Sequence, residues 1–237
     1  MTPRPQGAAD IHIHTTYTDG APTPSEVVAR AIELGLDVIA ITDHDSVEGA
    51  LATAESAGDR LEVVIGEEVS TRQGHVLGLF LTRTVAAGRD VWDTVEEIHA
   101  LGGLAIPAHP YLVLGGARGV GERGIGLAWD AIEVENGSPG AWLANRRARR
   151  ARHLWASSET GGSDAHILDA VGTVVTMFPG RSALDLRAAI QSGTTQAMRR
   201  RLAPLVAVRT LTRSVVRRLS GEADRERATR GVRAARR

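Results

Sequence analysis

The sequence predicts an α/β fold with a largely parallel sheet. Short apolar segments typical of strands alternate along the chain with amphipathic segments of helical periodicity. Strands that alternate with helices of about ten residues favour parallel pairing. Apolar residues make up 43% of the 237 residues and aromatic residues only 3%. Ala, Val, Leu and Ile must therefore fill the core of one large domain, or of one domain with an appendage.

Seven short apolar runs are expected to form strands. In chain order they are residues 9–14, 37–41, 61–65, 75–81, 104–107, 131–134 and 172–178. The sequence TRQG at residues 71–74 is typical of a turn. It should reverse the chain, so the third and fourth strands are expected to pair antiparallel.

Three segments carry helix start and stop signals. Each begins with a capping side chain (Thr, Asp or Ser) and ends at a glycine. In the first, Thr23 is expected to be the N-cap, with Pro24 at the first helical position and Glu26 completing a capping box. The expected bounds are 23–35, 90–102 and 182–193.

The chain has no cysteine. This excludes disulfides, zinc–thiolate sites and thiol nucleophiles, and it fits a reducing compartment. The N-terminus lacks the apolar segment of a signal peptide, and no run of ~18 apolar residues predicts a transmembrane helix. A cytoplasmic protein is therefore expected.

Charge is unevenly distributed, although the formal net charge is zero. Residues 198–237 contain 13 arginines and three acidic residues, out of 28 basic and 28 acidic residues in the chain. We expect a main domain over residues 1–197 and an Arg-rich C-terminal helix and tail over residues 198–237. The helix, residues 204–219, should pack on the domain or on a second subunit of a homodimer. Peripheral contact with an anionic membrane and binding of nucleic acid are the alternatives.

Histidines and carboxylates recur where predicted strands end. His12 and His14 share one face of the first strand, because side chains alternate along a strand, and two such imidazoles suit one metal ion. The pattern recurs in ITDHDS, VVIGEEVS, GGLAIPAHP and GGSDAH, with the polar residues Asp43, His44, Asp45, Glu67, Glu68, His109, Asp164 and His166.

These groups are expected to converge, because strand ends meet at one rim of a barrel and active sites form there. The predicted antiparallel turn would also bring His75 beside Glu68, and Asp19 follows the first strand. Six histidines and three carboxylates are too many ligands for one ion and about right for two or three.

The chain resembles the PHP (polymerase and histidinol phosphatase) family of metal-dependent phosphoesterases. DIHIHT, ITDHD, AHP and GSDAH match its four signature blocks in order, and GEEVS and HVLGLF match the segment that links them. The match covers roughly residues 8–195. It implies a distorted, TIM-barrel-like (β/α)7 barrel over residues 1–197, with a centre of two or three divalent ions (Mn²⁺, Zn²⁺ or Fe²⁺) on its rim.

The resemblance also implies which ion each side chain binds. Glu68 rather than Glu67 would be the bridging carboxylate, because the family pattern reads G-x-E-x-S and alternation sends the two side chains to opposite faces. By position, His12, His14 and Asp164 would bind the first ion, Glu68 would bridge the first and second, His75 and His109 would complete the second, and Asp19, His44 and His166 would hold the third.

The implied reaction is hydrolysis of a phosphate ester of a small molecule or nucleotide by a metal-activated water. Glu68 would act through the ions. Asp43 is a candidate for the acid that protonates the leaving group, or for a group that orients a histidine.

Substrate-binding residues are less sharply indicated. Arg118 and Arg123 lie in the Gly-rich stretch 115–126 and are candidates for gripping a phosphate, with a solvated loop as the alternative. Glu135 and Asn136 are pocket candidates or part of a turn. The basic segment 145–152 is expected to be a helix with a solvated face, or a nucleic-acid groove.

Three other functions remain open from the residues alone. The Arg-rich tail would suit an exonuclease that recruits nucleic acid to the same ions. Relatives often carry an Arg soon after the His-Pro of the third block, whereas His109 and Pro110 are followed here by YLV. This departure leaves carbamate or amide hydrolysis as an alternative. A non-catalytic module that holds metal and docks through its C-terminal helix is the third.

Overall fold

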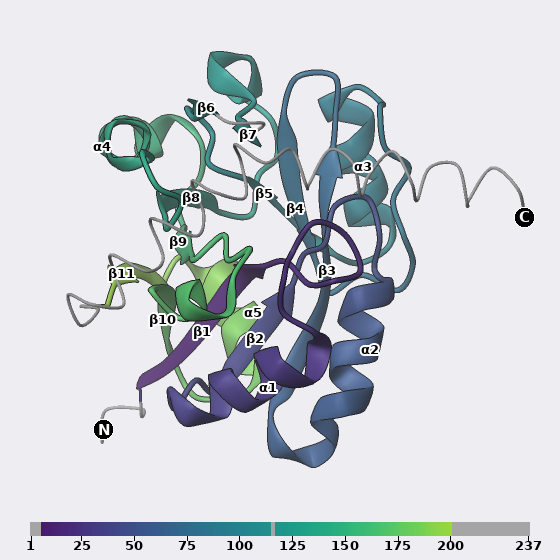
Figure 1. Ribbon diagram of the computed structural model, residues 1–237. Helices are drawn as coiled ribbons and strands as arrows, with labels where there is room; N and C mark the ends of the chain where they lie inside the picture. Colours follow the sequence, from purple (N-terminus) through teal and green to yellow (C-terminus); the bar gives the residue numbers. More distant parts are fainter. Residues whose placement is uncertain (1–5, 115–116, 201–237) are drawn as a thin grey trace, which may run out of the picture.

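The computed structural model describes residues 6–114 and 117–200 (Figure 1). Seven strands form one sheet in the order β11-β10-β1-β2-β3-β4-β5. These strands are β1 (Gln6–Ile13), β2 (Val38–Ile41), β3 (Glu62–Ser70), β4 (His75–Leu79), β5 (Leu104–Pro107), β10 (Val174–Pro179) and β11 (Gln196–Arg199). Two short ladders pair β6 (Val113–Leu114) with β7 (Ala117–Arg118) and β8 (Ile132–Asn136) with β9 (Glu159–Gly162).

Five α-helices accompany these strands: α1 (Pro24–Glu33), α2 (Glu48–Ala57), α3 (Val91–Ala100), α4 (Trp142–Ala151) and α5 (Ala183–Ser192). Four short 3₁₀ helices are η1 (Gly58–Arg60), η2 (Gly121–Gly124), η3 (Arg152–Leu154) and η4 (Leu168–Ala170). The α/β class expected from the sequence is confirmed.

The expectation of a largely parallel sheet is wrong. Within the seven-stranded sheet only β1–β2 and β2–β3 are parallel, and β3–β4, β4–β5, β1–β10 and β10–β11 are antiparallel. Helices α1 and α2 provide the crossovers that parallel pairs need, whereas a tight turn permits only antiparallel pairing. The expected turn at residues 71–74 is such a turn, with Thr71 N donating to Gly74 O at 3.0 Å.

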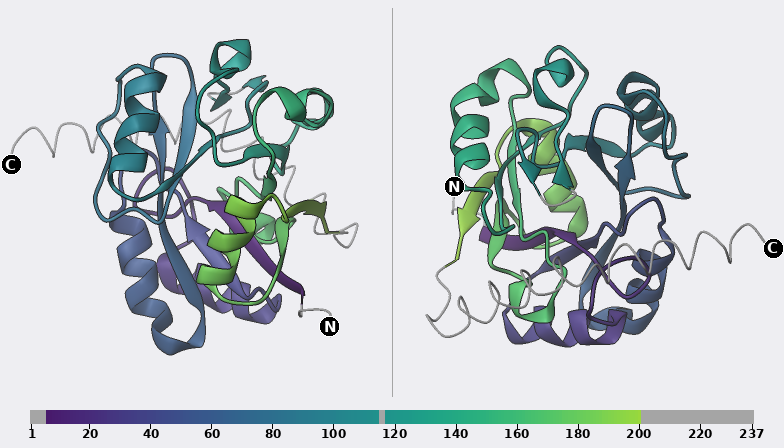
Figure 2. Two further views of the ribbon diagram at one scale, coloured as in Figure 1. Left: turned by 180° about the vertical axis from the view of Figure 1, so that it is seen from behind. Right: turned by 45° about the horizontal axis from the view of Figure 1, so that its top comes forward.

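The sheet curls into a half-barrel, and the β8–β9 ladder lies against both of its ends (Figures 1 and 2). On one side Asp130 N, just before β8, donates to Ala105 O of β5 at 3.0 Å. On the other side Gly161 N of β9 donates to Thr176 Oγ1 of β10 at 3.0 Å. The ladder therefore completes the wall around the carboxyl ends of β1 and β2.

The predicted helix caps are confirmed. Thr23 and Glu26 form a capping box at the start of α1, and Asp90 accepts a hydrogen bond from Trp92 N at the start of α3. Ser182 caps α5, which ends at Gly193 in the left-handed conformation (φ 69°). Each cap satisfies amide groups that a helix leaves free at its first turn, which is why these boundaries are readable from sequence.

Several elements were not foreseen or begin elsewhere than expected, and three of them illustrate why. Helix α2 has no side-chain cap at Val47. Strand β9 has the sequence ETGG, which has little intrinsic strand preference. The basic helix α4 begins at Trp142, three residues before the expected segment, and also lacks a side-chain cap. Tertiary pairing and packing, rather than local signals, place all three.

The core consists of aliphatic side chains, as the composition predicts. Phe178 is the only aromatic residue among the largest fully buried side chains of the described chain. The others are Ile11, Ile13, Ile39, Ile41, Leu77, Leu79, Ile98, Leu104, Ile106, Ile132 and Leu186. Most of them come from β1, β2, β4 and β5, so the strands that carry or directly precede the clustered histidines are well buried.

No helix in the described ranges is long and apolar enough to cross a membrane. The expected C-terminal helix and most of the Arg-rich tail lie outside the described residues. The boundary expected after residue 197 falls inside β11, where Val174 pairs with Arg199.

Candidate metal centre

The nine side chains singled out in the sequence come together at the carboxyl ends of the central strands. His12 lies in β1 and His14 directly follows it. Both are fully buried, and their ring centroids are 5.2 Å apart. Gly162 of β9 makes room for His12, because a Cβ there would lie 2.4 Å from the His12 Cβ. The unforeseen strand β9 is thus fitted directly against the site.

Glu68 lies at the middle of the cluster, because its two oxygens face two different sets of histidines. Oε1 is 2.9 Å from His75 Nδ1 and 2.9 Å from His109 Nε2. Oε2 is 3.4 Å from His12 Nε2, 3.3 Å from His14 Nε2 and 3.4 Å from His44 Nδ1. The antiparallel β3–β4 pair brings His75 to Glu68, as the turn sequence predicted.

Glu67 points to the opposite face of β3. Its side chain is buried, and Oε2 accepts a hydrogen bond from Val85 N at 2.9 Å. Burial raises the pKa of Glu67 to about 8. Strand alternation therefore separates these adjacent glutamates, one into the histidine cluster and one under the loop that precedes α3.

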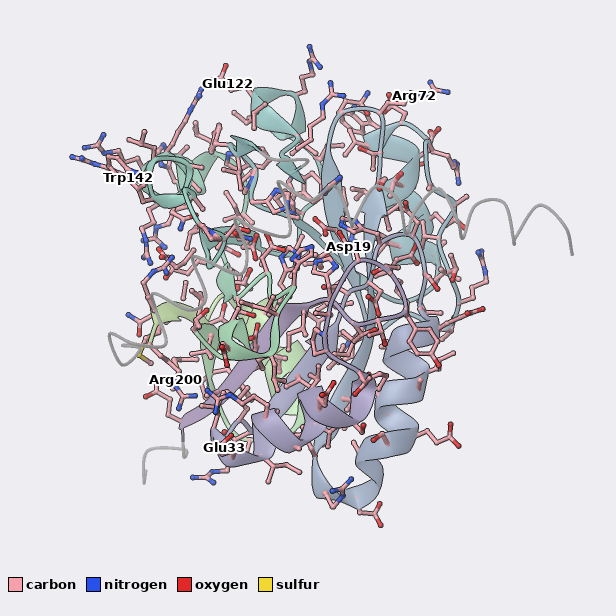
Figure 3. The ribbon with its side chains drawn as sticks, viewed as in Figure 1. Asp19, Glu33, Arg72, Glu122, Trp142 and Arg200 are labelled. Atoms are coloured by element: carbon pink, nitrogen blue, oxygen red, sulfur yellow. The ribbon has the colours of Figure 1, made fainter. Side chains whose placement is uncertain are left out.

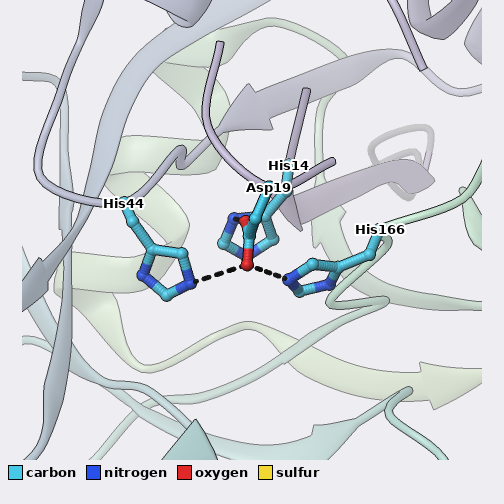
Figure 4. Close-up of side chains that lie close together, drawn as sticks. All are labelled: His14, Asp19, His44 and His166. Carbon is cyan, nitrogen blue, oxygen red and sulfur yellow. Dashed lines mark ion pairs between the residues drawn. The ribbon is translucent and has the colours of Figure 1, made fainter. Parts of the chain in front are cut away.

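Asp164 and Asp19 provide the other two carboxylates. Asp164 Oδ1 lies 3.5 Å from His12 Nε2, 3.4 Å from His14 Nε2 and 3.5 Å from His166 Nδ1. Asp19 Oδ2 lies between His44 Nε2 at 3.6 Å and His166 Nε2 at 3.2 Å (Figure 4). The three carboxylates are thus interleaved with the imidazole rings.

Backbone strain marks the same region. Among the described residues other than glycine, four have positive φ: Asp45, Phe80, His109 and Asp164. Two of these belong to the cluster and Asp45 follows His44. Such conformations are unfavourable for residues with a Cβ and persist where the surroundings require a particular side-chain direction. Here that direction is toward Glu68 and the two β1 histidines.

Four groups in this part of the chain have the geometry of metal sites, with ligand atoms within 4.8 Å of one another. They are His12, His14 and Asp164; His14, Asp19, His44 and His166; His12, Glu68 and His109; and His44, Glu68 and His75. The first two contain the sets expected for the first and third ions. Glu68 belongs to the other two, each of which contains one of the histidines expected for the second ion.

The donor atoms fit divalent cations. His12 Nε2 and both ring nitrogens of His14 are buried without a hydrogen bond in the described chain, and they face carboxylate oxygens at 3.3–3.6 Å. Leaving such a group unsatisfied costs about 1–3 kcal/mol. A cation between nitrogen and oxygen would satisfy both, and imidazole with carboxylate is a donor set common to zinc and iron sites.

Without a cation, the cluster holds protons. Burial alone would lower the pKa of His14, but the Asp164 and Glu68 carboxylates that face its ring raise it to about 10. Burial would raise the pKa of Glu68, but the neighbouring histidines outweigh burial and hold this pKa well below its ordinary value. Because a metal binds the neutral imidazole, metal binding must displace these protons.

Glu133 of β8 supports the cluster and was missed in the sequence. It is buried, and its Oε1 is 3.0 Å from His12 Nδ1. Its Oε2 accepts hydrogen bonds from His109 N at 2.6 Å and from Asn136 Nδ2 at 3.1 Å. With the His12 proton on Nδ1, the Nε2 lone pair is directed at Glu68 and Asp164. Such a partner fixes the tautomer and orientation of a metal-binding histidine.

The neighbouring Glu135 was selected from the same motif and lies elsewhere. The β8 register shifts between Glu133 and Glu135, so the two do not share a face as regular alternation would require. Glu135 instead pairs with Arg149 at 2.8 Å and with Arg199 at 2.7 Å. Glu135 lines a surface groove rather than the metal cluster, and a bulge that separates it from Glu133 cannot be read from local sequence.

Asp43 and Ser138 also hold parts of the site. The buried Asp43 carboxylate accepts hydrogen bonds from Thr15 N (2.8 Å), Thr15 Oγ1 (2.6 Å) and Thr18 Oγ1 (2.5 Å). It thereby anchors the turn that presents Asp19. Ser138 Oγ donates to Asp164 Oδ2 at 2.6 Å, leaving Oδ1 for the histidines.

Arg118 and Arg123 are exposed and lie outside the cluster. Together with Gln73 and Pro110 they line a surface groove beside the chain that follows His109. None of the described contacts joins either guanidinium to the nine clustered side chains. Their role in holding a phosphate remains a prediction.

A curled α/β sheet with a buried cluster of histidines and carboxylates at its strand ends is typical of a metal-dependent enzyme. Two family models match the chain: the PHP domain over residues 10–114 and a PHP-associated model over residues 142–195. The chain is 36% identical over 140 residues to the uncharacterized protein MJ1587 of Methanocaldococcus jannaschii, covering 54% of this chain and 81% of that protein. The chain belongs to the PHP family.

Other relatives share only part of their length with this chain. Identity is 38% over 115 residues with the 5'-3' exoribonuclease Rnm of Salmonella typhimurium, covering 39% of each protein. It is 43% over 74 residues with the error-prone DNA polymerase of Cutibacterium acnes, covering 28% of this chain and 6% of the polymerase. The chain thus spans well under half of these two relatives.

Solved structures share the fold. A two-domain protein from Bacteroides vulgatus, described as containing a predicted PHP-like metal-dependent phosphoesterase, matches with a TM-score of 0.66 and 20% identity, covering 82% of this chain and 65% of that one. PsfC from Pseudomonas syringae matches with a TM-score of 0.64 and 21% identity, covering 90% of this chain and 98% of that one. The TIM-barrel-like architecture expected from the motifs is consistent with these matches.

Proposed function

We propose that this protein is a metal-dependent phosphoesterase that hydrolyses a phosphate ester of a small molecule or nucleotide. The observation that carries the proposal is the position of Glu68, whose two carboxylate oxygens face five histidines. A carboxylate in that position suits two cations held close together. Family membership and the nucleic-acid-acting relatives support phosphoester chemistry.

We assign the nine clustered side chains to a centre of two or three divalent ions. Bound there, the ions would supply an activated water and neutralise the charge that builds on the phosphate. Mn²⁺, Zn²⁺ and Fe²⁺ are all compatible with these donors. We assign one ion to His12, His14 and Asp164. We assign another ion to Asp19, His44 and His166. Glu68 would lie between ions, with His75 and His109 beside its Oε1.

The protein's own groups fix the geometry. The Glu133 carboxylate accepts the Nδ1 proton of His12 and the backbone amide proton of His109. Ser138 fixes one oxygen of Asp164. Asp43 accepts three hydrogen bonds from residues 15–18, so we assign it to positioning the turn before Asp19 rather than to donating a proton to the leaving group.

The test is turnover of a panel of phosphomonoesters, phosphodiesters and nucleotides by protein reloaded with each of the three metals. Glu68→Gln and Glu67→Gln make a matched pair, because the same change is placed on opposite faces of β3. We expect metal-dependent turnover that is lost in Glu68→Gln and retained in Glu67→Gln. Bound metal, measured by elemental analysis, should fall only in Glu68→Gln.

Two results would contradict the proposal. Protein carrying two or three ions per chain that cleaves no phosphate ester would exclude phosphoesterase activity on those substrates, and carbamates and amides would be assayed next. Equal loss of turnover in both glutamate variants would show that Glu68 has no special role.

A further inference from the structure

The face formed by α4 and η3 carries a concentration of arginine that the proposed hydrolysis does not use. Residues 142–154 contain five arginines and no acidic residue. Arginines three and four positions apart on a helix repel one another and destabilise it. Helix α4 also lacks a side-chain cap and buries only Asn145 and Ala148. This distribution of charge therefore does not stabilise the helix by itself.

The acidic residues around this face are already paired. Glu122 pairs with Arg147 at 2.7 Å, and Glu159 with Arg152 at 3.3 Å. Glu135 is paired with two arginines, one from α4 and one from β11. Arg146 and Arg150 are exposed and make no ion pair within residues 6–114 and 117–200. The face therefore presents a net positive charge to solvent.

An exposed aromatic side chain accompanies these charges. Trp142 is 64% exposed and projects outward from the start of α4 (Figure 3). It lines the same groove as Arg146, Arg150 and Ser138. Arg146 follows Trp142 by four residues, so both lie on one side of the helix. An indole face beside guanidinium groups suits stacking of a base next to a bound phosphate.

One residue of this groove contacts the metal cluster. Ser138 lines it and donates to Asp164 at 2.6 Å. On the other side of α4, Arg147 borders a second groove with Arg118, Arg123 and Pro110, the residue after His109. Each of the two basic grooves beside α4 therefore includes one residue that hydrogen-bonds or directly follows a candidate metal ligand.

We propose that α4 and its two flanking grooves bind a single-stranded nucleic acid, with Arg146 and Arg150 on its phosphates and a base stacked on Trp142. A hollowed, basic surface leading to a metal cluster fits a flexible polyanion better than the flat surface of a membrane. This inference rests on the proposed function in one respect. One end of the bound nucleic acid would reach the centre that hydrolyses phosphate esters.

The test is binding of a fluorescently labelled single-stranded RNA or DNA oligonucleotide of about 12 nucleotides. Fluorescence anisotropy would be measured with the full-length protein in EDTA, so that no bond is cleaved. Arg146→Gln/Arg150→Gln is compared with Arg83→Gln/Arg181→Gln, which removes two exposed arginines from other faces. Trp142→Ala is compared with Trp92→Ala, since Trp92 is 55% exposed on α3.

We expect the α4 double variant to weaken binding on the order of tenfold and to reduce the salt slope by roughly 0.7 per lost phosphate contact. Trp142→Ala should weaken binding about tenfold. The two controls should bind as the wild type does. Circular dichroism would show that all variants are folded, as expected for exposed positions.

Other outcomes would overturn the proposal. Equal binding by the α4 variants and their controls would place any nucleic-acid contact elsewhere on the chain. Failure of the wild type to bind the oligonucleotide, with sedimentation on phosphatidylglycerol vesicles, would indicate a membrane surface instead. Binding is measured without metal, and hydrolysis of small esters is measured with metal. The two proposals can therefore fail independently of each other.

Discussion

At the scale of single residues, the cluster depends on carboxylates that are not ligand candidates themselves. Glu133 joins His12 of β1 to the backbone of His109 after β5, two segments far apart in sequence. It is buried, and both of its oxygens are used. A ligand histidine that lost this partner could change its tautomer or rotate away from Glu68.

Glu133→Gln should therefore weaken metal affinity about 10- to 100-fold while the protein stays folded. The amide can still accept from His109 N but no longer offers a charged acceptor to His12. The measurement is competition for metal with a chromogenic chelator. Glu135→Gln is the control, because this side chain pairs with arginines outside the cluster. Unchanged affinity in Glu133→Gln would show that Glu133 does not orient His12.

Glu67 should make stability depend on pH. Burial raises its pKa from 4.5 to about 8, so between these values the folded protein holds a proton that the unfolded chain has released. The free energy of unfolding from this group is therefore greatest below pH 4.5, and it falls as pH rises to about 8. Glu67→Gln removes this titration and keeps an acceptor for Val85 N.

Thermal denaturation of metal-free protein at pH 5 and pH 8 measures the difference. The wild type should lose more of its Tm over this range than Glu67→Gln does. Glu55→Gln, at an exposed position of α2, should behave as the wild type. An identical pH dependence in all three proteins would exclude a buried, protonated Glu67.

At the scale of elements, local sequence predicted some boundaries and not others. The caps at Thr23, Asp90 and Ser182 are confirmed because a cap is made within four residues. Strand β9 was missed because its two glycines carry no strand preference, and its place depends on pairing with β8. Gly162 makes β9 hard to recognise in the sequence, and its lack of a side chain also allows β9 to pack against His12.

Gly162→Ala should therefore damage both stability and the metal centre. The new Cβ would lie 2.4 Å from the His12 Cβ and 2.9 Å from Glu133 Oε1, so both groups must move. We expect a loss of about 1–3 kcal/mol in the free energy of unfolding, as for other overpacked sites, and weaker metal binding.

Gly58→Ala is the control for this change. Its φ of 52° strains an alanine by about 1–3 kcal/mol, but nothing lies within 4 Å of the added Cβ. Denaturant unfolding should show a loss of stability in both variants, and metal titration should show weaker binding only in Gly162→Ala. Normal metal affinity in Gly162→Ala would mean that β9 and His12 can separate without consequence.

At the scale of the whole molecule, the candidate ligands come from segments far apart in the chain. They include His14 after β1, Glu68 in β3 and Asp164 after β9. A bound ion would tie these segments together in the folded state alone. Metal should therefore stabilise the entire domain, by about 2.7 kcal/mol at 100 times the Kd for one site.

The measurement is the Tm of chelator-treated protein before and after adding Mn²⁺ or Zn²⁺. We expect a rise in the wild type and in Arg83→Gln, and little or no rise in Glu68→Gln. If neither ion nor Fe²⁺ raises the Tm of the wild type, the cluster does not bind metal with useful affinity in the folded protein.

The sequence by itself determined the α/β class, the helix caps, the pairing of β3 with β4, and which nine side chains would meet. These follow from signals within a few residues, or from motifs whose spacing places polar groups at strand ends. Only the tertiary structure decided the mixed sheet, strand β9, the bulge that separates Glu133 from Glu135, and the grooves beside α4. Those features depend on contacts between residues far apart in the chain, and their energies leave no periodic pattern in the local sequence.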